Sequence, residues 1–135
     1  MAQEDQVDKA EKIMKNLSRN RHMVTTGQIR KFLTAVNSVS GKIDMYRNQH
    51  AGENVQTMPV ELQAEVKYLK VKLAYQIGRA RPKRQGDVNP VEELAKEAGL
   101  MERIDNVKND MAKYDEFARF IEALVAFHKF YGGKD

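Results

Sequence analysis

The chain has 135 residues, a length at which one domain with its own hydrophobic core is expected. It has no Cys, which excludes disulfide bonds and zinc–thiolate sites, and no apolar run approaches the roughly 20 residues of a membrane span. The formal net charge is +4, and this total hides a gradient of charge along the chain.

Helix-forming residues are plentiful and Pro is sparse, so the composition favours an all-α fold. The first predicted helix covers residues 4–18, where Val7, Ala10, Ile13, Met14 and Leu17 recur at helical spacing. The rest of this segment is highly charged. Residues 1–22 are therefore a candidate peripheral helix.

A second helix is predicted to follow Thr25, because Thr25 and Gln28 have the spacing of a capping box. Its apolar side chains form one stripe, as a core-facing helix needs. They are Ile29, Phe32, Leu33, Val36, Val39, Ile43 and Tyr46. Residues 48–58 are polar and predict a loop.

The third predicted helix has Pro59 in its first turn. Its inner stripe is Leu62, Val66, Leu69, Leu73 and Ile77. The opposite face carries Tyr68, Val71 and Tyr75 among basic residues, so this helix is either sandwiched in the core or presents a second face to a partner. For the two tyrosines, the helical spacing favours packing in the core.

Pro82 predicts that the third helix ends near Arg81, and the following loop is the most basic stretch of the chain. Asn89 and Pro90 predict the start of a short helix, with an N-cap and a first-turn Pro. Its apolar residues are Val91, Leu94, Ala95 and Ala98, and Ile104, Val107 and Met111 continue at helical spacing.

The last helix is predicted from about Asp115 to Tyr131. Its apolar face includes Phe117, Phe120, Ile121, Leu124, Phe127, His128 and Tyr131. His128 is interpreted as a half-buried histidine with one ring nitrogen in a hydrogen bond. Because the loops are short, we expect a compact, mostly antiparallel bundle of five to six helices in a single domain over residues 1–135.

No catalytic motif is visible: the chain has no phosphate-binding Gly-rich loop, no nucleophile elbow and no His pair at helical zinc-site spacing. The acids Glu102, Asp105, Asp110, Asp115 and Glu116 alternate with lysines, as on a solvated helix rather than in a divalent-metal site. We therefore expect no catalytic residue, no metal and no cofactor. A catalytic pair that only the tertiary fold assembles, as in a metal-dependent nuclease, stays an alternative.

Charge is distributed unevenly along the chain. Lys and Arg outnumber Asp and Glu in residues 23–86, and the reverse holds in residues 87–135. This pattern favours a polyanion-binding face, unless the charges only solubilise the helices. No RNP, KH or zinc-finger motif accompanies the cations, so sequence-specific readout is not indicated.

Three stretches resemble one family. They are TTGQIRKFLTAVNSV at residues 25–39, LAYQIGRAR at residues 73–81 and FARFIEALVAFHKFYGGKD at residues 117–135. Together and in this order they resemble the small subunit of the type III-A CRISPR–Cas effector (Csm) complex. The third stretch is the most distinctive, because any amphipathic helix can imitate the other two.

The resemblance implies a compact helical bundle and a non-catalytic, RNA-binding role in antiviral defence. In that family, several copies of the small subunit line the duplex of CRISPR RNA and target RNA. The expected partners are therefore both RNAs, further copies of the chain, and the backbone and large polymerase-like subunits. Exposed apolar positions such as Val71, Ala126 and Phe130 are candidates for contacts between copies.

The candidate RNA-binding residues come from two sources. Arg30 and Lys31 lie in the first matching stretch and Arg79 lies in the second, so the resemblance carries the role to them. Charge pattern alone adds Arg47, Lys67, Arg81, Lys83 and Arg84.

Neither a signal-peptide core nor a membrane span is visible, so we expect a cytoplasmic protein without a membrane partner. The main alternative function is a protein-only helical scaffold or adaptor whose basic loop binds an acidic partner.

Overall fold

The structure is a computed structural model, and it describes residues 5–19 and 23–132. Within those residues the chain forms helices and no strand, so the predicted all-α fold is confirmed. The helices are α1 (Gln6–Leu17), α2 (Thr26–Gln49), α3 (Val60–Arg79), α4 (Pro90–Ala98), α5 (Leu100–Val107) and α6 (Met111–Phe130). None of them is long and apolar enough to cross a bilayer.

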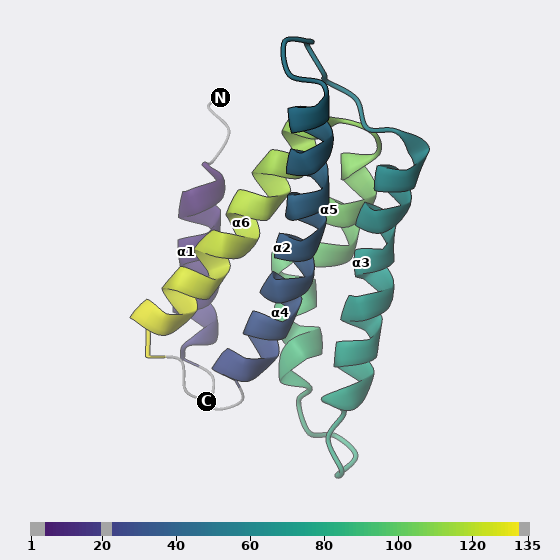
Figure 1. Cartoon of the computed structure of the whole chain (residues 1–135). Coiled ribbons are helices and arrows are strands. Elements are labelled where there is room, and N and C mark those ends of the chain that lie inside the picture. Colours follow the sequence, from purple (N-terminus) through teal and green to yellow (C-terminus); the bar gives the residue numbers. More distant parts are fainter. Residues whose placement is uncertain (1–4, 20–22, 133–135) are drawn as a thin grey trace.

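The three long helices α2, α3 and α6 determine the shape of the bundle. Helix α2 packs between α6 and α3, and α5 packs against both α3 and α6. Figure 1 shows that α3 runs antiparallel to α2 and to α5, and that α6 runs antiparallel to α2. Helix α1 packs on the outer side of α6 and runs in the same direction as α6 (Figure 1).

The helix ends follow local sequence signals. The Gln28 backbone N–H donates to Thr25 Oγ1 at 3.1 Å, and Gln28 Oε1 accepts from the Thr25 N–H at 2.9 Å, which confirms the capping box. Asn89 caps α4 by accepting from two backbone N–H groups. Gly99, with φ of 59°, ends α4 in the left-handed conformation that glycine adopts readily.

The junction between α5 and α6 differs from the predictions. Met111 was predicted to continue the helical run of Ile104 and Val107, but α5 ends at Val107 because the backbone turns at Lys108, with φ of 51°. Helix α6 therefore begins at Met111 rather than near Asp115, and Asp110 caps it by accepting from the N–H groups of Ala112 and Lys113.

The core takes side chains from all six helices. Residues 1–22 were a candidate peripheral helix, but α1 packs into the core within the described part of that segment. Ala10 and Met14 have no exposed surface, and the Tyr131 hydroxyl donates to Glu11 Oε2 at 2.8 Å. The charged outer face of α1 concealed a narrow apolar stripe that is sufficient to pack against α6.

Candidate nucleic-acid interface

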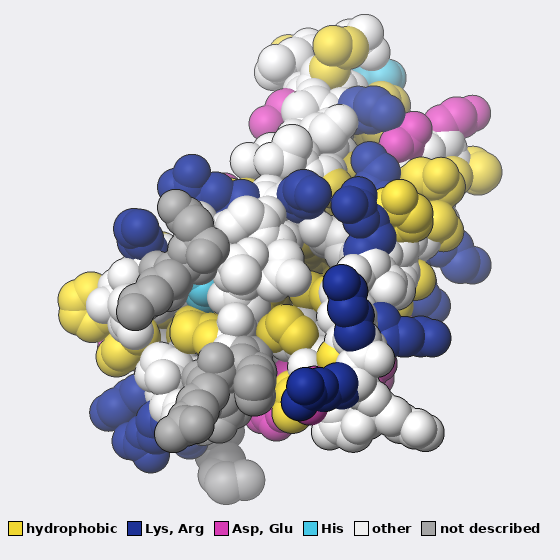
Figure 2. Space-filling model, turned by 90° about the horizontal axis from the view of Figure 1, so that it is seen from below, with side chains coloured by type: hydrophobic (Ala, Val, Ile, Leu, Met, Phe, Trp, Pro, Cys, Tyr) yellow, Lys and Arg dark blue, Asp and Glu magenta, His cyan; other side chains and the backbone are white. Residues whose placement is uncertain are grey.

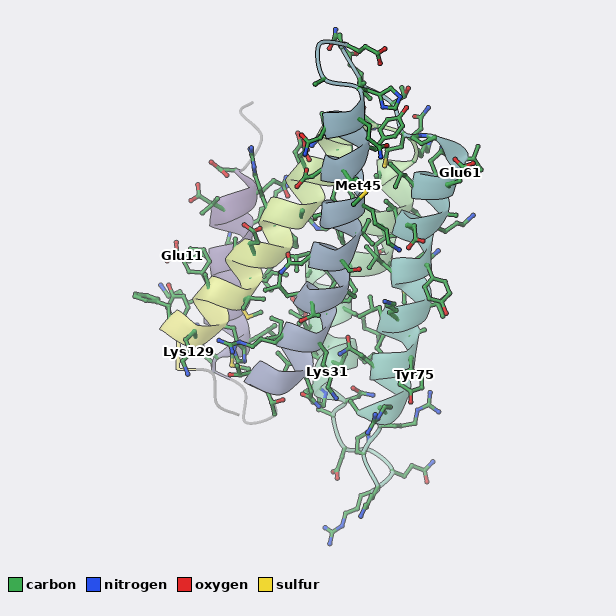
Figure 3. All side chains as sticks on the ribbon, viewed as in Figure 1. Glu11, Lys31, Met45, Glu61, Tyr75 and Lys129 are labelled. Atoms are coloured by element: carbon green, nitrogen blue, oxygen red, sulfur yellow. The ribbon has the colours of Figure 1, made fainter. Side chains whose placement is uncertain are left out.

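An open groove of about 830 Å³ lies between α2 and α3. Its lining includes Gln28, Lys31, Thr34 and Ser38 of α2, and Tyr68, Val71, Lys72, Tyr75, Gln76 and Arg79 of α3. We call it the α2–α3 groove. Lys31 and Tyr75 lie in the lower parts of the two helices in Figure 3. Gln76 Nε2 donates to the Gln28 carbonyl oxygen at 3.1 Å, which links the two helices beside the groove.

The tyrosines of α3 were predicted to pack in the core, and this prediction is wrong. Tyr68 is 54% exposed and Tyr75 is 65% exposed. Helix α3 packs on its neighbours through one stripe that includes Leu69 and Leu73, and no other element of the described chain covers the tyrosine face. The apolar residues on the second face of α3 were the signal for this exposure.

Three cations line the groove: Lys31, Lys72 and Arg79. Among the described residues, no Asp or Glu lines it, and none of these cations forms an ion pair. The Arg79 guanidinium carbon lies 5.9 Å from the centre of the Tyr75 ring. The groove therefore combines aromatic surface with positive charge that the described chain does not neutralise.

Lys72 is one of the basic residues that accompany Tyr68, Val71 and Tyr75 on the second face of α3, but it was not among the eight candidate RNA-binding residues. It follows Tyr68 by four residues and precedes Arg79 by seven, which places all three on one side of α3. This spacing was the signal that could have identified Lys72 from the sequence.

Four other candidates lie at the same end of the bundle. Arg30 is exposed near the start of α2, and Arg81, Lys83 and Arg84 are exposed in the loop between α3 and α4. This loop is at the bottom of Figure 1. The view from below in Figure 2 shows Lys and Arg side chains along the α3 side with apolar side chains between them, and further cations on the opposite side.

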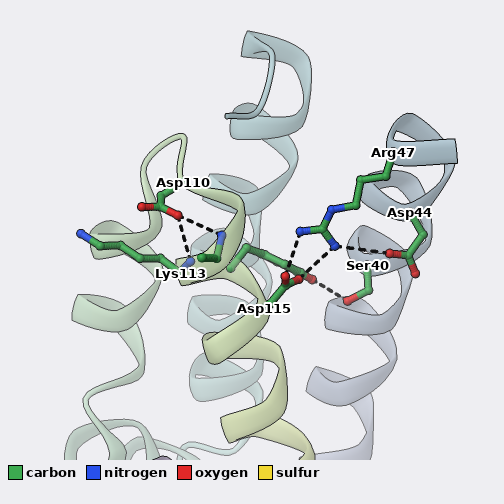
Figure 4. Close-up of polar contacts among 8 residues, drawn as sticks. Ser40, Asp44, Arg47, Asp110, Lys113 and Asp115 are labelled. Carbon is green, nitrogen blue, oxygen red and sulfur yellow. Dashed lines mark hydrogen bonds and ion pairs between the residues drawn. The ribbon is translucent and has the colours of Figure 1, made fainter. Parts of the chain in front are cut away.

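Arg47 lies at the other end of α2 and is held by acids. Its Nη1 is 3.2 Å from Asp115 Oδ1, its Nη2 is 2.8 Å from Asp115 Oδ2, and Asp44 lies 3.8 Å away (Figure 4). The hydrogen bond to Asp115 raises the pKa of Arg47. This two-point contact joins α2 to α6, so the structure does not bring Arg47 to the groove.

Lys67 is exposed on the other flank of α3. It lines a separate hollow of about 250 Å³ with Asp105 and Lys108, between α3 and α5. The neighbouring Lys70 Nζ lies 2.8 Å from Asp105 Oδ1. Of the eight candidates, Lys31 and Arg79 line the groove, four lie near it at the same end, and Lys67 and Arg47 lie away from it.

His128 is a core residue, as predicted, and is more buried than expected. Only 1% of it is exposed, and its Nε2 lies 2.6 Å from the Val24 carbonyl oxygen. Among the acids of the C-terminal third, Asp110 caps α6 and Asp105 forms an ion pair with Lys70. Within residues 5–19 and 23–132, no group of three or more His, Asp and Glu residues is arranged to hold a metal ion.

The fold and the groove define a small protein whose described residues are largely helical and form a basic, aromatic-lined face between α2 and α3. The family model described as Csm2 Type III-A matches residues 1–134. The chain belongs to this Csm2 family, and the resemblance seen in the sequence is confirmed.

Proteins named "CRISPR system Cms protein Csm2" are similar to this chain over most of their length. The protein from Streptococcus thermophilus is 33% identical over 100% of this chain and 98% of its own length. The protein from Mycobacterium tuberculosis is 27% identical, covering 98% of this chain and 96% of the relative. The protein from Enterococcus italicus is 29% identical over 80% of this chain and 68% of the relative.

Proposed function

We propose that this protein is a non-catalytic, RNA-binding small subunit of a type III-A CRISPR effector complex. In this role it lines the duplex of CRISPR RNA and target RNA in the cytoplasm, in antiviral defence, beside further copies of itself and the backbone and large subunits. Membership of the Csm2 family supports the assignment to the complex. The observation that carries RNA binding is the convergence of Lys31, Lys72 and Arg79 on a groove whose described lining contains no acid.

Unpaired cations suit this role because phosphate binding releases condensed counterions from the RNA. Such binding is independent of sequence. In RNA-guided complexes, base pairing between guide and target supplies the sequence specificity, so the protein needs only shape and charge. Arg30, Arg81, Lys83 and Arg84 would extend the contact along the RNA from the same end of the bundle.

The residues of the groove also support a non-catalytic role. Acid–base catalysis and metal binding use carboxylate or imidazole groups in most enzymes. None of the described residues that line the α2–α3 groove is Asp, Glu or His. The cleavage of RNA would then belong to other subunits of the complex.

The test of this proposal removes the positive charge of the groove. We expect the triple variant Lys31→Gln, Lys72→Gln, Arg79→Gln to bind RNA more weakly and to reduce the slope of log affinity against log salt by about three units, roughly one for each cation that no longer neutralises a phosphate. Fluorescence anisotropy of labelled RNA over a series of salt concentrations measures both quantities.

The matched control is the triple variant Lys15→Gln, Lys113→Gln, Lys129→Gln. It removes the same charge from exposed positions on α1 and α6. We expect its affinity to change little. An equal loss of affinity in the two variants would show that RNA responds only to net charge, and RNA binding with a shallow salt slope in the wild type would favour a protein-only adaptor.

A further inference from the structure

The exposed tyrosines add a property that phosphate binding does not require. We infer that the α2–α3 groove holds unpaired nucleotides, whose bases stack on Tyr68 and Tyr75 while their phosphates contact Lys31, Lys72 and Arg79. This inference rests on the proposed function and specifies the form of RNA that the groove binds.

The two rings offer separate stacking sites on one rigid face. Tyr68 and Tyr75 are seven residues apart, about 10.5 Å along the axis of α3, so one base cannot stack on both. Val71 lies between them, is 52% exposed and supplies apolar surface. The buried side chains of Leu69 and Leu73 anchor the inner face of α3 in the core. The positions of the two tyrosine rings are therefore determined by a packed helix.

The size of the groove agrees with a few nucleotides. Its volume of about 830 Å³ is within the range of about 300–1,000 Å³ that small-molecule sites occupy. In a fully paired A-form duplex the bases are stacked inside, so protein aromatic side chains can stack only on bases that leave the helix or lie at its ends. The tyrosine faces therefore contribute affinity for unpaired nucleotides and little for a continuous duplex.

The charge of the groove favours RNA over a protein helix as its occupant. Arg79 lies near the Tyr75 ring, Lys72 lies between the two tyrosines in sequence, and Lys31 faces them from α2. An apolar partner helix would leave these three cations without counter-charges. A strand of RNA provides both an anionic backbone and flat base surfaces, and Thr34 and Ser38 can hydrogen-bond to ribose hydroxyl groups.

The experiment compares two RNAs of nearly equal charge: a labelled duplex, and the same duplex with a short unpaired loop at its centre. Fluorescence anisotropy at fixed salt measures the affinity of the full chain for each. We expect the wild type to bind the looped RNA about ten-fold more tightly, and the double variant Tyr68→Leu, Tyr75→Leu to bind both RNAs equally.

Two control variants separate the rings from other effects. Tyr68→Phe, Tyr75→Phe keeps both rings and should keep the preference for the loop. Phe130→Leu removes an aromatic ring that is 74% exposed on α6, away from the groove, and should also keep it. Circular dichroism confirms that each variant is folded.

The possible results distinguish the inference from the proposed function. Equal wild-type affinity for both RNAs, or a loop preference that survives in the leucine variant, overturns the inference and leaves salt-dependent RNA binding intact. Loss of self-association in the leucine variant, seen by sedimentation with unchanged RNA affinity, would assign the tyrosine face to a second copy and also overturn it. An absence of RNA binding by the wild type would refute the proposed function itself.

Discussion

Arg103 contrasts with the cations of the groove, because it is partly buried and is held by neutral groups. Its Nε donates to the Ala98 carbonyl oxygen at 2.8 Å, its Nη1 donates to Gln6 Oε1 at 2.6 Å, and its guanidinium carbon lies 3.6 Å from the centre of the Phe120 ring. Burial lowers the pKa of Arg103. These contacts join α1, the end of α4 and α6, so Arg103 has a structural role and is not a free cation.

Tyr114 has a similar joining role among the polar groups of the core. It is 1% exposed, its hydroxyl donates to the Val36 carbonyl oxygen at 2.9 Å, and its oxygen lies 2.8 Å from Ser40 Oγ. Burial raises the pKa of Tyr114 to about 12, from the ordinary 10.0. The hydroxyl therefore keeps its proton in the folded chain at a pH where the unfolded chain has lost it.

This difference predicts an alkaline loss of stability. Between about pH 10 and 12 the unfolded state binds fewer protons than the folded state at this position, so the free energy of unfolding falls as pH rises. Denaturant unfolding across this range measures the slope. Tyr114→Phe should be less stable than the wild type at neutral pH, and its free energy of unfolding should fall less steeply over this range. Identical slopes in the two proteins would contradict the assignment to Tyr114.

At the scale of elements, the connections differ in how they are held. The turn between α5 and α6 is fixed by backbone hydrogen bonds to the loop before α3: the Met58 N–H donates to the Asn109 carbonyl oxygen at 2.8 Å, and the Met111 N–H donates to the Gln56 carbonyl oxygen at 3.0 Å. By contrast, the basic loop between α3 and α4 has Arg81, Lys83 and Arg84 exposed.

The basic loop can therefore be altered without disturbing the core. We expect Arg81→Glu, Lys83→Glu, Arg84→Glu to weaken RNA binding while stability changes by only about 0.5 kcal/mol, because exposed charges contribute little to folding. Anisotropy measures binding and thermal unfolding measures stability. The control Lys15→Glu, Lys113→Glu, Lys129→Glu makes the same change in net charge elsewhere. Unchanged affinity in a folded loop variant would remove this loop from the interface.

At the scale of the whole molecule, the core connects all six helices. Helix α1 contributes Ala10 and Met14, which are fully buried, and packs along α6. We propose on this basis that residues 1–135 unfold as a single domain, with α1 as part of the cooperative unit.

Two methionines test this proposal. Met14→Ala should cost about 2–5 kcal/mol of stability, because it leaves a cavity in the core, and unfolding should stay a single transition. Met45→Ala is the matched control: Met45 is 62% exposed on α2, and the cost should stay within about 0.5 kcal/mol. Denaturant unfolding followed by circular dichroism measures both. A small loss of stability in Met14→Ala, or a separate unfolding transition of α1 at low denaturant concentration, would show that α1 is peripheral.

Local patterns in the sequence predicted a large part of this molecule. The capping box at Thr25, the Asn89–Pro90 helix start and the inner stripe of α3 depend only on neighbours a few residues away, and all are confirmed. The Lys108 turn was missed, because its backbone is held by residues 56–58, about fifty positions earlier. The family was also identified from three short stretches of the sequence, and the match to the family model confirms it.

The candidate site shows the limit of such patterns. Helical periodicity alone determines which residues of α3 share a face, but the neighbours that cover each face come from distant parts of the chain. Charge pattern therefore could not distinguish Arg47 from Arg79. Only the tertiary fold places Asp115 beside Arg47 and leaves Arg79 in an open groove. By itself, the sequence determined most of the helical segments, their inner faces and the family. The exposure of Tyr68 and Tyr75 and the pairing of each cation were decided by long-range packing, because burial and charge neutralisation depend on what lies opposite in space.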